Sequence, residues 1–254
     1  MPEVQEIISQ IIECNGCDLR KNIIKHYGEK INSPYDTFHF YYSQSDIKIA
    51  RFIAIMQNPN PPKEGEIKKP SIIDGDEKFI AANRQFLISW LKTKNGSFLE
   101  KFVKILRKYK LLEYVIGDPN FDGSFLKDFL FTDIVKCKSY TKSVSPENVG
   151  TCHGKYLKKE LEQFGKDKLI FVFSSRAWES IYDHYIYMPT QENIDKKLNK
   201  VTHVHGQLFK SEILNSYFIP LVHFSQLNNL LRNSYFEYLE EGLKEYSELI
   251  KHTN

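Results

Sequence analysis

Apolar runs of strand length alternate with longer segments of helical spacing, and this alternation limits the fold more than any other feature of the chain. Strands are expected within Asp46–Asn58, Phe125–Val135, Lys168–Phe173 and Tyr217–Val222. These runs are largely continuous in their apolar residues, which is typical of strands covered on both faces. Helices are expected at Val4–Cys14, Phe79–Leu91, Phe98–Leu112, Gly154–Phe164 and Phe236–Ile250, after a Ser174–Ser175 cap near Arg176, and after His223.

Strands that alternate with helices favour a mostly parallel sheet with helices on both faces. The sequence therefore predicts an α/β fold, a three-layer α/β/α arrangement around a central four-stranded sheet, in a single domain over residues 1–254. Ligands of such sheets bind at the carboxyl ends of the strands. Three segments are expected at that edge: the loop after Ile55, the strand end at Asp133, and His223.

The composition is that of a soluble globular protein, with 41% hydrophobic and 26% charged residues. The sequence has no apolar run near the roughly 20 residues that a membrane helix needs, and its N-terminus lacks the basic start of a signal peptide. We therefore expect an intracellular protein whose thiols stay reduced. A net charge of +3 neither requires nor excludes nucleic acid. Lysines gather in Lys101–Lys110, Lys136–Lys142 and Lys155–Lys159, and each group taken alone is equally compatible with a solvated surface.

The four cysteines suggest a metal site. Cys14 and Cys17 form a CxxC pair, whose spacing lets both sulfurs face one metal. Cys137 follows a predicted strand and Cys152 precedes a predicted helix. Four thiolates satisfy either a tetrahedral zinc or a cubane iron–sulfur cluster, and spacing alone does not choose between them. Four unrelated buried cysteines are the alternative.

Six short motifs in order resemble those of the iron–sulfur (family-four-type) uracil-DNA glycosylases. They are CNGCDLR at 14–20, MQNPN at 56–60, TDIVKC at 132–137, TCHGKYL at 151–157, LIFVFSSRA at 169–177, and HFSQL at 223–227 followed by LLRN at 230–233. The resemblance spans residues 14 to about 233 and includes all four cysteines. It implies the fold, DNA containing a damaged or deaminated base as partner, a monomer, and a [4Fe–4S] cluster on Cys14, Cys17, Cys137 and Cys152, with zinc as the second choice.

The resemblance also implies roles for pocket residues. Asn58 would position water near C1′ of the sugar, and His223 would donate a hydrogen bond to the base oxygen that becomes anionic. Backbone amides near Gln57 would add donors, and Phe79 would stack on the extruded base. A turn-forming Asn58, a structural His223 and a core Phe79 are the simpler alternatives.

Three departures from the family motifs bear on the substrate. Met56 and Asn60 replace glycines, Phe224 replaces a proline, and Asp133 stands where the family has a base-reading asparagine. An amide both donates and accepts, whereas a carboxylate only accepts unless burial keeps it protonated. We therefore expect altered or broadened base specificity. A strand cap or a lysine partner is the alternative role for Asp133.

The DNA-contacting residues expected from the resemblance are Lys136, Lys138 and Lys142 for phosphates, Leu231 as a wedge into the duplex, and Arg232 for a further phosphate. The function expected is a monofunctional DNA glycosylase that hydrolyses the N-glycosidic bond of uracil or another deaminated base in base excision repair. One alternative is a DNA-binding protein of the same fold that senses damaged or single-stranded DNA with weak or no catalysis. Another is a zinc-stapled α/β protein with an unrelated nucleotide-type ligand.

Overall fold

The computed structural model describes residues 6–7, 10–11, 13–27, 50–57, 96–112, 128–137, 144–186, 198–223 and 229–253. Its helices are α2 (Asp18–Tyr27), α4 (Gly96–Lys108), α5 (Pro146–Cys152), the π-helical η7 (His153–Leu157), α6 (Lys158–Phe164), α7 (Ser175–Ile181), the π-helical η8 (Tyr182–Ile186), α8 (Val201–Val204) and α9 (Asn229–Thr253). Its strands are β1 (Phe52–Met56), β2 (Phe129–Asp133), β3 (Leu169–Phe173), β4 (Phe209–Ser211) and β5 (Ser216–Pro220).

The strands form one sheet in the order β2-β1-β3-β5-β4. The first four in this order are parallel, and β4 pairs antiparallel with β5. All four predicted strands are confirmed, but the prediction of a four-stranded sheet is wrong, because β4 adds a fifth strand at one edge. β4 has only three residues, too few to show a periodicity in the sequence.

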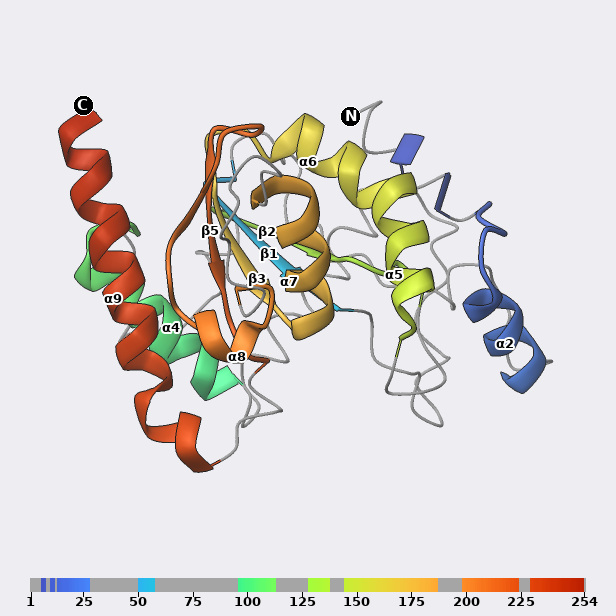
Figure 1. Cartoon of the computed structure of the whole chain (residues 1–254), viewed down its shortest axis with the longest axis horizontal. Helices are drawn as coiled ribbons and strands as arrows, with labels where there is room; N and C mark the ends of the chain where they lie inside the picture. The colour runs from blue at the N-terminus through green and yellow to red at the C-terminus, as the bar shows by residue number, and fades with distance from the viewer. Residues whose placement is uncertain are drawn as a thin grey trace.

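Helices cover both faces of the sheet, as expected for a three-layer α/β/α fold (Figure 1). Helices α4 and α9 pack on one face, and α5, α6 and α7 lie on the other (Figure 1). Within the described residues, no helix is long and apolar enough to cross a membrane.

The face under α4 is aromatic. Phe52 lies 4.9 Å from Phe129 between ring centroids, and Phe102 of α4 meets Phe171 edge-on at 4.8 Å. Successive side chains of a strand point to opposite faces. Asp133 therefore shares the α4 face with Phe129 and Phe131, whereas Thr132 points to the face covered by α6.

The structure moves several helix boundaries from their predicted positions. Helix α4 ends at Lys108 rather than at Leu112, because Lys110 takes a left-handed φ of 57°. The N–H groups of Lys110 and Leu111 then bond the carbonyls of Arg107 and Leu106, which is the Schellman pattern. That pattern usually has glycine at the position of Lys110. The sequence therefore does not indicate that the helix ends there.

Other helices begin earlier than predicted. Helix α5 starts at Pro146, where the Ser145 hydroxyl accepts from the Asn148 N–H and proline occupies the first turn. Helix α9 starts at Asn229 rather than at Phe236. The Ser174 cap is confirmed, since its hydroxyl accepts from the Ala177 N–H at 2.9 Å.

Near the N-terminus, residues 6–7 and 10–11 are helical, and Cys14 lies just beyond the helix. The predicted helix Phe79–Leu91 lies outside the described residues, as do residues 224–228, where a helix was expected to begin directly after His223.

Candidate active site and cysteine cluster

The carboxyl ends of the four parallel strands meet at one edge of the sheet. Met56 is in register with Asp133 on one side and with Phe173 on the other. The chain runs from β1 outward to β2 and then returns past β1 to β3, so the direction of winding reverses at β1. Ligands of open α/β sheets bind in the crevice at such a reversal. Gln57, which directly follows β1, therefore stands at the expected ligand position.

Gln57 and Asp133 are neighbours across this edge. The Val135 N–H donates to the Gln57 carbonyl at 3.0 Å, and the Ile134 N–H donates to the Met56 carbonyl at 2.8 Å. These bonds continue the ladder between β1 and β2 beyond the last strand residue. The loop that begins at Gln57 and the end of β2 are thereby fixed side by side.

Asp133 carries a buried carboxyl group, one oxygen of which makes no hydrogen bond within the described residues. The residue is only 3% exposed, and its Oδ2 atom has no hydrogen-bond partner within the described part of the chain. Burial raises the pKa of Asp133 to about 7; the Lys136 ammonium opposes this rise and the Glu160 carboxylate adds to it. The group can therefore hold a proton near neutral pH and act as a donor, or lose it and act only as an acceptor.

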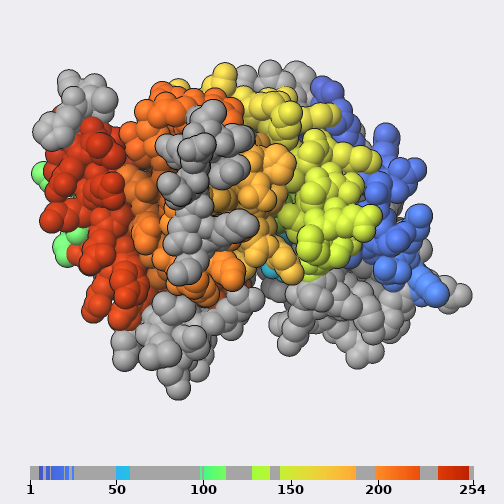
Figure 2. All heavy atoms as spheres, in the orientation of Figure 1, coloured from blue at the N-terminus to red at the C-terminus, as the bar shows by residue number. Residues whose placement is uncertain are grey.

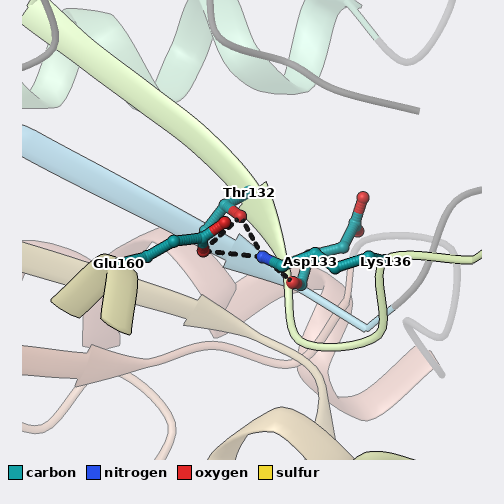
Figure 3. A network of polar contacts seen from close by, with 4 residues as sticks. All are labelled: Thr132, Asp133, Lys136 and Glu160. Carbon is teal, nitrogen blue, oxygen red and sulfur yellow. Dashed lines mark hydrogen bonds and ion pairs between the residues drawn. The ribbon is translucent and has the colours of Figure 1, made fainter. Parts of the chain in front are cut away.

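Lys136 is buried, and the prediction that it binds DNA phosphates is wrong. Its ammonium donates to Thr132 Oγ1, to the Asp133 carbonyl and to Glu160 Oε2, each at 2.6 Å (Figure 3). Lys136 is 2% and Glu160 1% exposed, so the pair is closed to solvent. The lysine was expected at the surface because lysines gather between Lys136 and Lys142, but Lys136 is buried and Glu160 compensates its charge.

The same network orients Asp133. Its carbonyl faces the Lys136 ammonium, whereas its carboxylate points away from that ammonium (Figure 3). This agrees with the strand alternation, which places the Asp133 side chain on the α4 face. The buried pair therefore holds the backbone of Asp133 and leaves its carboxyl group outside the ion pair.

His223 lies just past β5 at the same edge. The Leu221 N–H donates to the Val172 carbonyl of β3 at 2.8 Å, so the chain keeps its parallel course beyond Pro220. Burial lowers the pKa of His223 to about 4. The imidazole is thus neutral at neutral pH and retains one N–H donor. β5 is separated from β1 by β3, which places the two strands about 10 Å apart.

The four cysteines are reduced and lie together, although they come from the N-terminal segment, the segment that follows β2 and the end of α5. The Cys17 thiol hydrogen-bonds with those of Cys137 and Cys152 and, with burial, raises the pKa of both. Cys14 lies near enough that its charge also raises the pKa of Cys137. It forms a hydrogen bond with Tyr156. The Lys136 backbone N–H donates to the Cys152 sulfur and opposes the rise in its pKa.

Within the described ranges, no group of three or more His, Cys, Asp or Glu side chains is arranged to hold a metal ion as it stands. The thiols bond to one another in the protonated form, whereas a bound metal requires thiolates spaced around it. The donor set itself, four cysteines with a backbone N–H on one sulfur, fits a thiolate-bound centre.

The N-terminal segment is held against the helices that follow Cys152. Tyr156 Oη donates to the Gln10 carbonyl at 3.1 Å, and Lys159 donates to the Gln10 side chain at 2.8 Å. Figure 2 shows this contact from outside, with the N-terminal atoms in blue against the yellow-green α5–α6 region. The segment carrying Cys14 and Cys17 is therefore anchored beside Cys152 by contacts that need no metal.

Several predicted site residues fall outside the described residues: Asn58, Phe79, Lys138 and Lys142. Leu231 and Arg232 lie in the first turns of α9, where their side chains are likewise outside the described part. Their predicted roles remain predictions.

Glu160 is a residue of this network that the sequence patterns did not predict. It lies three residues after Leu157 and four before Phe164, both of which are buried, so it belongs to the apolar face of its helix. A charged residue on such a face requires a partner of opposite charge. The position of Glu160 among apolar residues therefore predicts a buried cation near it.

Comparison with protein families now identifies the superfamily. The model of the uracil DNA glycosylase superfamily matches residues 77–245, which is more than half of the chain. The chain belongs to the uracil DNA glycosylase superfamily. Members of this superfamily are DNA glycosylases, and the match includes Asp133, Cys137, Cys152 and His223. The matched region begins after Cys14 and Cys17, and the match is to the superfamily as a whole rather than to its iron–sulfur subtype. No curated protein matches the chain significantly.

Proposed function

We propose that this member of the uracil DNA glycosylase superfamily is a monofunctional glycosylase that excises uracil or another deaminated base from DNA. The observation that carries the proposal is the meeting of Gln57, Asp133 and His223 at the carboxyl edge of one parallel sheet, with a buried Asp133 oxygen left without a partner in the described chain. A buried polar atom without a partner costs about 1–3 kcal/mol, so a ligand that satisfies it is favoured.

The reaction is hydrolysis of the bond between C1′ of the sugar and the base nitrogen. A water oxygen bonds to C1′, the C1′–N bond breaks, and its electron pair leaves with the base. The proton that the water loses passes to solvent, and the departed base anion takes one up to become the free base. Asn58 would orient the water, and His223 would donate its N–H to the base oxygen on which negative charge develops. The low pKa of His223 keeps the imidazole uncharged at neutral pH, and the neutral ring carries one N–H that can donate to the base oxygen.

Asp133 would determine which base is accepted. In its protonated form it donates to a carbonyl oxygen such as O4 of uracil, and in its ionised form it accepts from ring N–H groups or an exocyclic amine. With a pKa of about 7, both forms are available near neutral pH. Specificity that broadens or shifts with pH follows from this, in contrast to an asparagine at the same position.

Cys14, Cys17, Cys137 and Cys152 would hold a [4Fe–4S] cluster, or zinc in its place. When bound, the group supplies a cross-link between the N-terminal segment and the β2–α5 region rather than chemistry on the base. Lys138, Lys142 and Arg232 would contact phosphates, and Leu231 would fill the space left by the extruded base.

The test is excision from oligonucleotides containing uracil, hypoxanthine, xanthine or cytosine analogues, followed from pH 5.5 to 8.5 by strand cleavage at abasic sites. Wild-type uracil excision should fall above about pH 7, as Asp133 loses its proton. Asp133→Asn should excise uracil without that fall. A flat wild-type profile with full uracil activity and no second substrate would contradict the role of Asp133.

A further inference from the structure

A closed ring of hydrogen bonds surrounds Val222, the residue directly before His223. The Val222 N–H donates to Nδ1 of His205 at 3.2 Å, and the Val222 carbonyl accepts from Tyr235 Oη at 2.9 Å. His205 Nε2 donates in turn to the Tyr235 carbonyl at 3.2 Å. The imidazole of His205 and the ring of Tyr235 lie 4.2 Å apart between centroids. Both polar groups of Val222 are therefore fixed, and one of them belongs to the peptide unit that joins Val222 to His223.

The ring of hydrogen bonds around Val222 is shielded from water. His205 is 5% exposed, Tyr235 0% and Val222 4%. Burial lowers the pKa of His205 to about 4, so its imidazole stays uncharged at neutral pH. A neutral imidazole accepts on one nitrogen and donates from the other, as both bonds of His205 require.

These contacts replace a strand neighbour that β5 lacks at its end. On the side away from β3, β4 pairs with β5 only as far as Phe218. Beyond Phe218, the Pro220 carbonyl accepts from the Gly206 N–H at 2.9 Å, and Val222 bonds to His205 and Tyr235. The turn after α8 and the helix α9 thus supply the partners that a longer β4 would have supplied.

We propose that His205 and Tyr235 are positioning residues that fix the peptide unit leading into His223, and so aim its imidazole at the departing base. The proposal rests on the proposed function of His223. A hydrogen bond from a neutral donor weakens steeply as its angle and distance depart from the optimum. Stabilisation of the leaving base therefore depends on where the backbone places His223, beyond the presence of the imidazole itself.

The test is the dependence of excision on the leaving group. Tyr235→Phe removes only the hydroxyl, and single-turnover excision of uracil should fall at least tenfold while DNA affinity changes less than twofold. Excision of 5-fluorouracil, a better leaving group that needs less stabilisation, should fall less. In a His223→Ala background, Tyr235→Phe should cause no further loss. Tyr246→Phe, on the same helix α9, serves as the control and should match the wild type.

Variants at His205 supply a second comparison that retains the Tyr235 hydroxyl. His205→Phe removes the acceptor for the Val222 N–H and should show the same leaving-group dependence as Tyr235→Phe. His205→Gln retains a side-chain carbonyl and should recover part of the uracil rate. Equal losses for both bases in Tyr235→Phe and His205→Phe, or an unchanged uracil rate in both, would overturn the proposal.

The position of His223 can also be read without catalysis. In NMR spectra of the protein without DNA, the imidazole signals of His223 should shift in Tyr235→Phe and stay in place in Tyr246→Phe. If the wild type released no base yet these signals moved, the positioning role would stand and the glycosylase proposal would fail. If the wild type released base and the signals did not move, the positioning role would fail alone.

Discussion

Breaking the buried pair of Lys136 and Glu160 should destabilise the protein far more than breaking an exposed ion pair on α6, the helix that carries Glu160. Lys136→Met takes the ammonium, 2.6 Å away, from a Glu160 carboxylate that is 1% exposed, and removes three hydrogen bonds of 2.6 Å. Loss of one partner of a buried pair typically costs about 3–5 kcal/mol. The free energy of unfolding should therefore fall by about that amount.

A double variant separates the charge from the packing. In Lys136→Met/Glu160→Gln neither group is charged, and the glutamine oxygen can still accept from the Thr132 hydroxyl, which now bonds Glu160 at 2.9 Å. The double variant should be more stable than Lys136→Met by about 2 kcal/mol or more, because position 160 then carries no buried charge that has lost the Lys136 ammonium.

The matched control is the surface pair of Lys158 and Glu162, whose charged atoms lie 3.9 Å apart with side chains 59% and 56% exposed. Lys158→Met/Glu162→Gln should cost less than about 1 kcal/mol. Urea unfolding at pH 7, extrapolated linearly to zero denaturant, measures all four proteins at equal metal content. A loss in Lys136→Met no larger than in the control, or a double variant no more stable than the single one, would refute the reasoning.

Because the folded pKa of Asp133 is raised from 3.8 to about 7, its ionisation costs stability as pH rises from about 4 to 7; Asp133→Asn should remove this decline, on the order of 4 kcal/mol at most, in urea unfolding across that range. Cys137→Ser should lose the bound metal, seen as lower iron or zinc per protein by elemental analysis and a lower melting temperature, whereas unchanged metal content would exclude Cys137 as a ligand. Gly206→Ala should cost at least about 2 kcal/mol, because φ is 82° and a Cβ would lie 2.4 Å from the Tyr238 carbonyl; Gly150→Ala, with open space around it, should instead stabilise by about 0.5–1 kcal/mol in thermal unfolding.

The parts of the fold that the sequence predicted are those encoded by local pattern. The four parallel strands were visible because each is a continuous apolar run, and the Ser174 cap because a hydroxyl precedes a helical segment. β4 was missed because three residues carry no measurable period. The end of α4 was misplaced because Lys110 occupies a left-handed position that sequence patterns assign to glycine.

The site was less visible because its contacts join distant parts of the chain. Asp133 and His223 could be placed at one edge from strand ends alone. The inward turn of Lys136 could not, since its partner Glu160 is 24 residues away. The ring around Val222 joins His205 to Tyr235 across 30 residues, and no spacing rule links those two positions.

The most direct test of the central claim is detection of the released base itself. A uracil-containing oligonucleotide is incubated at pH 6 with the purified protein, and free base and abasic DNA are quantified by mass spectrometry beside His223→Ala. We expect one free uracil for each abasic site, formed in a single turnover and at least tenfold slower in His223→Ala. Tight binding of the DNA with no free base, from uracil or from any other deaminated base tested, would contradict it.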